Sequence, residues 1–178
     1  MTGARDNGSG QRRGMIDDSD TGAVDRQREI DERFMRDALE EGARALRLGE
    51  VPVGAVVVRD AVIIGRGHNE VERRQLATAH AEMLAMESAA RESGDWRLDG
   101  STMYVTVEPC HMCLGAALLS RIGRIVFGAP QPRTGACGSA GDLHEAGLGG
   151  HRIEVTGGIL EMESLLLLQE FFTRLREA

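Results

Sequence analysis

Two short segments restrict the chemistry and the fold of this chain more than any other feature. The first is His80-Ala81-Glu82, and the second is Pro109-Cys110-His111-Met112-Cys113. Cys110 and Cys113 are three positions apart, so on the first turn of a helix their sulfurs lie on one face and can reach one ion. Zn²⁺ favours thiolate and imidazole ligands, and His80 completes a set of three. We therefore predict a zinc site whose fourth position is left for a solvent molecule.

Glu82 lies two residues after His80 and adds a free carboxylate to this predicted site. Zn²⁺ lowers the pKa of a bound water molecule from about 15.7 toward roughly 7, which makes water a usable nucleophile at neutral pH. Glu82 cannot be a ligand if the fourth position stays open, but it is close enough to carry protons between that water and a leaving group. We therefore predict that Glu82 is the general acid and base of a hydrolytic reaction.

The cysteine content bears on the alternatives to a catalytic zinc site. A CxxC pair also occurs in redox-active sites and, together with a second pair, in structural zinc sites. No second pair is present, because the third cysteine is Cys137, in the loop-like segment 134–139. Three cysteines, two of them in the predicted zinc site, provide no disulfide framework and are typical of a reducing cytoplasm. We therefore predict a cytoplasmic protein with a catalytic zinc ion.

The charge and hydropathy of the chain restrict its partners. No apolar segment approaches the ~20 residues that span a bilayer, and the first residues lack the apolar core of a signal peptide, so we expect no membrane partner. The net charge of −7 argues against nonspecific binding of nucleic acid. All 21 cationic residues are arginine, however, and arginine forms forked contacts with phosphate and stacks on bases. The net charge therefore does not exclude a local RNA-binding site.

The hydrophobic periodicity predicts one α/β domain after a tail. Residues 1–27 are rich in Gly, Asp, Ser and Arg and nearly free of bulky apolar side chains, so we expect a disordered tail before one domain over residues 28–178. Helical spacing predicts helices over 32–48, 78–92, 110–120 and 159–175. β-branched segments predict strands over 53–58, 62–67, 103–107, 124–128 and 151–155. This alternation predicts a three-layer α/β/α fold around a central five-stranded mixed sheet.

The chain resembles the tRNA-specific adenosine deaminases of the cytidine deaminase-like fold, from about Arg33 to Arg176. The H-x-E and P-C-x-x-C pattern is also a general signature of zinc nucleobase deaminases. Beyond it, the resemblance rests on segments 50–55, 67–69, 78–82, 98–104, 107–110, 115–116, 120–122, 126–129, 134–135, 138–139 and 171–172. It implies zinc-dependent hydrolytic conversion of adenosine to inosine at the wobble position of a tRNA anticodon, with one Zn²⁺ per subunit and the tRNA anticodon stem-loop as partner.

The resemblance also implies a role for individual residues. His80, Cys110 and Cys113 match the zinc ligands, and Glu82 matches the proton shuttle. Asn69 matches the asparagine that hydrogen-bonds the flipped nucleotide, although an asparagine after Gly-His could also only close a turn. The remaining expected substrate contacts are Pro52 and Val53 as an apolar wall, backbone groups near Ala81 and Cys110, Gln131, Arg133, Phe172, Arg174 and Arg176.

Three further expectations remain open. Pro130-Gln131-Pro132-Arg133 departs from the family, which usually has an acidic residue and a lysine there, so a deaminase of a free base or nucleoside of guanine or cytosine type is the alternative. A catalytically inactive zinc-binding partner subunit is a third possibility, against which the presence of Glu82 counts. A homodimer is implied by the resemblance and by surplus apolar residues: Met112, Leu114, Ala117, Leu118 and 165–168.

Overall fold

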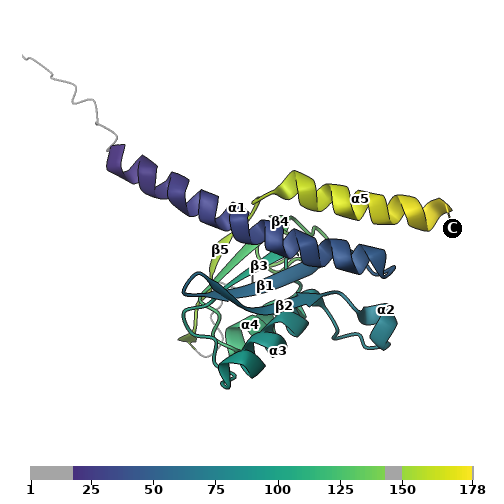
Figure 1. The fold of residues 1–178 in the computed structure, drawn as a ribbon, viewed down its shortest axis with the longest axis horizontal. Helices are drawn as coiled ribbons and strands as arrows, with labels where there is room; N and C mark the ends of the chain where they lie inside the picture. Colours follow the sequence, from purple (N-terminus) through teal and green to yellow (C-terminus); the bar gives the residue numbers. More distant parts are fainter. Residues whose placement is uncertain (1–17, 143–149, 178) are drawn as a thin grey trace, which may run out of the picture.

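A mixed β-sheet forms the centre of the computed structural model, which describes residues 18–142 and 150–177 (Figure 1). In these residues the sheet has five strands in the order β2-β1-β3-β4-β5. β1 pairs antiparallel with β2 and β3, whereas β3, β4 and β5 are parallel. The strands are β1 (Gly54–Arg59), β2 (Val62–His68), β3 (Thr102–Val107), β4 (Arg124–Ala129) and β5 (Glu154–Thr156).

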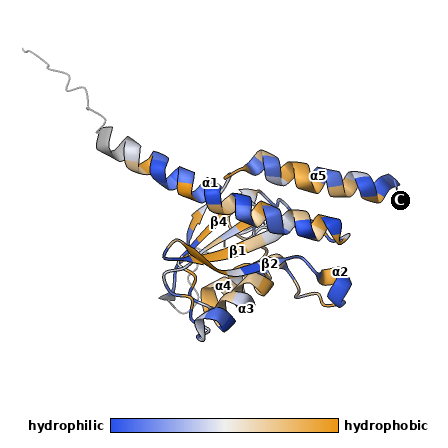
Figure 2. Cartoon of the chain, in the orientation of Figure 1, coloured by the Kyte–Doolittle hydropathy of each residue, from blue (hydrophilic) through white to orange (hydrophobic). Residues whose placement is uncertain are grey.

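Helices cover both faces of the sheet (Figure 1). One face carries α1 (Asp18–Arg47) and α5 (Glu161–Glu177), and the other carries α3 (Ala81–Ser93) and α4 (His111–Leu119). Side chains alternate across each strand, so Val56 and Tyr104 pack under α1 while Val57 and Val105 pack under α3 and α4. Apolar residues run along the strands, and polar residues interrupt the apolar ones on α1 and α5 (Figure 2). The predicted three-layer α/β/α fold is confirmed.

The first helix is longer than predicted. The expected disordered tail over residues 1–27 is wrong for 18–27, which belong to α1, and residues 1–17 lie outside the described part of the chain. Ion pairs one turn apart, such as Arg28–Glu32, support a helix whose composition is highly polar. Although α1 has 30 residues, no helix among the described residues is both long and apolar enough to cross a membrane.

Asp31 fastens this long helix to the sheet. Its carboxylate is buried and accepts hydrogen bonds from Arg124 at 2.7 and 2.8 Å and from the Tyr104 hydroxyl at 3.0 Å. Burial alone would raise the pKa of Asp31, but the hydrogen bonds and the Arg124 charge outweigh burial, and the pKa is lowered. Gln27, from the segment predicted as tail, adds a fourth bond at 3.0 Å. A long-range ion pair therefore decides where α1 lies.

Two glycines of β2 set the position of α3. A Cβ atom on Gly65 would lie 2.3 Å from the Ala85 carbonyl oxygen, and one on Gly67 would lie 2.4 Å from the Ala81 carbonyl oxygen. Only glycine permits so close an approach of a helix backbone to a strand. Because Ala81 is the first residue of α3, this contact places the flanking residues His80 and Glu82 at the end of the sheet.

Several predicted element boundaries are shifted. α3 begins at Ala81 rather than residue 78, and β5 covers 154–156 rather than 151–155. A short helix that was not predicted, α2 (Val71–Arg74), follows β2. Its four residues are too few to produce a recognisable hydrophobic period.

Candidate active site

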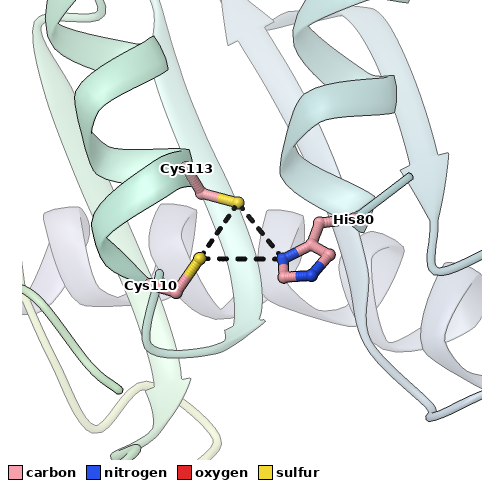
Figure 3. A group of neighbouring side chains, drawn as sticks. All are labelled: His80, Cys110 and Cys113. Atoms are coloured by element: carbon pink, nitrogen blue, oxygen red, sulfur yellow. Dashed lines mark hydrogen bonds between the residues drawn. The ribbon is translucent and has the colours of Figure 1, made fainter. Parts of the chain in front are cut away.

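His80, Cys110 and Cys113 converge between the first turns of α3 and α4 (Figure 3). The His80 Nδ1 atom lies 3.7 Å from Cys110 Sγ and 3.5 Å from Cys113 Sγ, and the two sulfurs are 3.7 Å apart. A tetrahedral zinc ion, with Zn–S near 2.3 Å and Zn–N near 2.0–2.1 Å, separates its ligand atoms by about 3.5–3.8 Å. The three atoms therefore have the spacing and the chemistry of zinc ligands.

Each helix contributes to this group through its N-terminal end. His80 and Cys110 are the N-cap residues of α3 and α4, and both have extended backbone, with φ of −71° and −75°. Cys113 follows in the first turn of α4. Free backbone N–H groups and the helix dipole favour negative charge at such positions. The prediction that both metal-binding segments begin helices is confirmed.

The two sulfurs differ in their tendency to lose a proton. Contact with Cys113 and with His80 lowers the pKa of the Cys110 thiol to about 3, against the opposing effect of burial. The contact with Cys110, together with burial, raises the pKa of Cys113. Cys110 is therefore the thiol that loses its proton more readily, and a coordinating metal ion deprotonates a thiol outright. The residues present fit Zn²⁺.

Glu82 lies in the first turn of α3 and is 4% exposed. Burial raises the pKa of its carboxyl, and its own backbone N–H and the His80 charge offset this only in part. A glutamic acid that holds its proton more readily than usual suits a group that takes and returns a proton near neutral pH. Glu82 lines a cavity of about 300 Å³ together with His80 and Cys110.

Only some of the residues predicted to bind substrate line this cavity. Val53, Asn69 and Gln131 line it. Pro52 and Ala81 are buried but do not line it. The lining residues that sequence reasoning did not select are Glu50, Val51, Val71, Glu72, Val107, Glu108 and Thr134.

The predicted RNA-contact residues lie outside the cavity. Arg133 is exposed in the loop after β4, and Phe172 is 47% exposed on α5, where its ring meets that of Phe171 edge-on at 5.3 Å. Arg174 pairs with Glu170, and Arg176 is exposed near the end of α5. The C-terminal end of α5 extends toward the same end of the molecule as α2 (Figure 1). Phe172, Arg174 and Arg176 therefore do not line the cavity, whereas Arg133 lies between the lining residues Gln131 and Thr134.

Glu108 is a site residue that the sequence analysis missed. It is 3% exposed, and its carboxylate accepts hydrogen bonds from the backbone N–H groups of Gln131 (2.9 Å), Cys137 (2.9 Å) and Ser139 (3.1 Å). These bonds lower the pKa of Glu108 although burial opposes them. The sequence signal that could have identified Glu108 is an acidic residue placed between an apolar strand and Pro109. Glu108 thus holds the loop that carries Gln131 against the cavity.

Comparisons with known proteins agree with this geometry. A family model described as the cytidine and deoxycytidylate deaminase zinc-binding region matches residues 28–129. The tRNA-specific adenosine deaminase of Bacillus subtilis is 46% identical over 147 residues, which cover 83% of this chain and 91% of that protein. The tRNA-specific adenosine deaminase of Haemophilus influenzae is 48% identical over 150 residues, covering 84% of this chain and 87% of that protein.

Solved structures show the same fold. A chain from a study of A-to-I editing by tRNA:A34 deaminases superposes with a TM-score of 0.70 at 37% identity, covering 76% of this chain and 99% of that one. Guanine deaminase from Nitrosomonas europaea superposes equally well, with a TM-score of 0.70, but at 25% identity, covering 80% of this chain and 84% of that one. The chain therefore belongs to the cytidine and deoxycytidylate deaminase family of zinc-binding proteins and, within it, to the tRNA-specific adenosine deaminases.

Proposed function

We propose that this protein is a zinc-dependent enzyme that deaminates adenosine to inosine at the wobble position of a tRNA anticodon. The observation that carries hydrolytic deamination is the buried carboxylate of Glu82, which lines one cavity with His80 and Cys110 of the ligand group. The choice of substrate rests on the relatives, whose names assign them to tRNA adenosine. A structural zinc site has no use for a proton shuttle, so the inactive-subunit alternative is disfavoured.

In this proposal His80, Cys110 and Cys113 hold Zn²⁺, which when bound lowers the pKa of water toward about 7. Glu82 accepts a proton from the attacking water and delivers it to the purine ring nitrogen. It then takes the second proton from the hydroxyl group formed on the attacked carbon and delivers it to the amino group, so that the C–N bond breaks and ammonia leaves. Asn69 hydrogen-bonds the flipped nucleotide, and Val53 packs against its base. Water and adenosine are thereby converted into inosine and ammonia.

A substrate panel tests this function. We expect an anticodon stem-loop with adenosine at the wobble position to be converted, and free adenosine to be a very poor substrate, because binding energy from the loop helps to align the reacting base. Mass spectrometry of the products measures both, with guanosine at the wobble position as the matched control. If free guanine or cytosine is converted faster than the stem-loop, the protein is a free-base or nucleoside deaminase instead.

We also propose that Arg133 contacts an RNA phosphate near the mouth of the cavity. Its neighbour Gln131 lines the cavity, so an exposed cation two residues away is placed near the RNA that carries the flipped base. Arg133→Ala should weaken stem-loop binding and reduce its salt dependence by about one charge, without loss of zinc. Binding titrations at several salt concentrations measure this. An unchanged affinity and salt slope would remove Arg133 from the RNA interface.

Arg152 provides a matched control for that titration. It is also an exposed arginine, but it precedes β5, whereas the cavity residue Val107 ends the parallel strand β3. Arg152 therefore lies at the N-terminal end of the parallel strands, opposite to the C-terminal end where Val107 lines the cavity. Arg152→Ala should leave stem-loop affinity unchanged.

We further propose a homodimer in the cytoplasm, where a tRNA substrate is found. Leu114, Ala117 and Leu118, three of the residues on which the dimer prediction depended, are buried in the core and are unavailable. The outer face of α4 instead presents residues 112, 115, 116 and 119, and Leu119 is 71% exposed. Light scattering at micromolar concentration should show twice the 19.3 kDa chain mass, and Leu119→Glu should yield monomers. A monomeric wild-type protein would contradict the proposal.

A further inference from the structure

Glu50 is a buried carboxylate in the wall of the cavity, and the mechanism proposed above gives it no role. It is 1% exposed and lies in the connection between α1 and β1. Its backbone N–H is bound to the Ala45 carbonyl oxygen at 3.0 Å, so the turn that carries it is tied to α1. A carboxylate is costly to bury unless hydrogen bonds satisfy it. The groups that bind Glu50 therefore indicate what this residue holds in place.

Three N–H groups from the segment after β2 bind the two carboxylate oxygens. Asn69 Nδ2 donates to Glu50 Oε2 at 3.0 Å, and the backbone N–H of Glu72 donates to the same oxygen at 3.2 Å. The backbone N–H of Arg73 donates to Glu50 Oε1 at 2.6 Å. α2 has no side-chain cap of its own, so Glu50 supplies the missing acceptor from a distant part of the chain.

The bond to Asn69 has a chemical consequence for the cavity. A carboxylate only accepts hydrogen bonds, so the nitrogen end of the Asn69 amide has to face Glu50 and the reversed orientation is disfavoured. The backbone N–H of Asn69 is bound separately to the Val53 carbonyl oxygen at 2.9 Å, which holds the main chain of this residue. The Asn69 carbonyl oxygen Oδ1 makes no hydrogen bond within the described part of the chain and is left for a ligand of the cavity.

We infer that Glu50 is a positioning residue, which orients the Asn69 amide so that its carbonyl oxygen accepts a hydrogen bond from the bound nucleoside. The inference rests on the proposed function and adds a second residue behind Asn69. Glu50 also anchors α2, whose Val71 and Glu72 line the same cavity. The Glu50 carboxylate thus sets both the orientation of the Asn69 amide and the position of α2 in the cavity wall.

Glu50→Gln tests the inference because it keeps the size of the side chain and places an NH₂ group opposite N–H donors. In the zinc-loaded protein we expect the single-turnover deamination rate of the stem-loop to fall about 10–100-fold, as for a slightly misplaced reactant. Zinc content and the stem-loop Kd should be unchanged. Glu41→Gln is the matched control, because Glu41 is also a 1% exposed glutamate but lies on α1 outside the cavity, and it should keep the wild-type rate.

A double-mutant cycle separates positioning from a general structural role. If Glu50 acts through Asn69, then Glu50→Gln should cost little further rate in an Asn69→Ala background. Asn69→Asp should be severely impaired because two carboxylates meet, and adding Glu50→Gln should recover part of the rate because the donor and the acceptor are exchanged. Additive losses in the cycle, or no recovery in the exchanged pair, would overturn the inference.

A measurement without substrate distinguishes this inference from the proposed function. In NMR spectra of the zinc-loaded protein, the Asn69 side-chain NH₂ should be shifted and slowly exchanging, and Glu50→Gln should abolish both properties. If wild-type protein fails to deaminate the stem-loop but the Asn69 signals respond in this way, the substrate proposal fails and the positioning role stands. Unchanged Asn69 signals in Glu50→Gln would refute the positioning role regardless of activity.

Discussion

Glu82→Ala is expected to abolish deamination of the stem-loop while zinc and fold are retained. Loss of a general acid and base typically costs a factor of about 10²–10⁴, and here one carboxylate serves several proton transfers, so we expect at least the upper part of that range. Single-turnover rates measure the loss, while metal analysis and circular dichroism follow zinc and fold. Glu82→Gln should behave alike, because an amide keeps the shape but cannot take up a proton.

Glu87→Ala is the matched control for this experiment. Glu87 lies on the same helix, is exposed, and pairs with Arg91. Its removal should leave the rate unchanged. Deamination by Glu82→Ala at the wild-type rate would exclude Glu82 from the mechanism. Loss of zinc together with loss of activity would show that Glu82 supports the metal site rather than the proton transfers.

Cys113→Ser is expected to lose zinc and thermal stability together. A serine hydroxyl is a poor replacement for a soft thiolate ligand, and metal binding contributes directly to folding stability in sites of this kind. Cys113 is 0% exposed, so the substitution also leaves a polar hydroxyl in the core. Wild-type protein should show a lower Tm after treatment with a chelator, whereas the Tm of Cys113→Ser should be low and insensitive to the chelator.

Cys137→Ser controls for the loss of a buried thiol in general. Cys137 is 8% exposed and lies outside the ligand group, so zinc content should stay at one ion per chain. Full zinc occupancy in both Cys110→Ser and Cys113→Ser would show that the ligands have been assigned wrongly.

The sequence was most informative where geometry is local. Cys110 and Cys113 share a helix turn, so their spacing alone predicts that both sulfurs reach one ion, and the sulfurs are indeed 3.7 Å apart. β-branched segments and helical spacing predicted the strands and the main helices for the same reason. α1 shows the limit: local polarity suggested disorder before residue 28, but the ion pair of Asp31 with Arg124, which are far apart in the chain, helps to hold a longer helix.

The cavity wall could not be predicted because its carboxylates have distant partners. Glu50 and Glu108 have the composition of surface residues, and most glutamates are solvated. Each is buried because the fold brings it to backbone N–H groups that lie 22 or more positions away in the sequence. The predicted RNA contacts on α5 are likewise not among the lining residues, and the terminal helix packs on the opposite face of the sheet from α3 and α4.

The residue types at positions 80, 82, 110 and 113 by themselves determined which metal could bind and that a free carboxylate would lie beside it, because ligand chemistry and helix periodicity are local properties. Only the tertiary structure decided where those groups lie and how their pKa values are shifted. Close packing of α3 on the glycines of β2 sets the place of His80 and Glu82. Burial then raises the pKa of Glu82, because desolvation depends on everything that surrounds a charge and not only on its neighbours in the sequence.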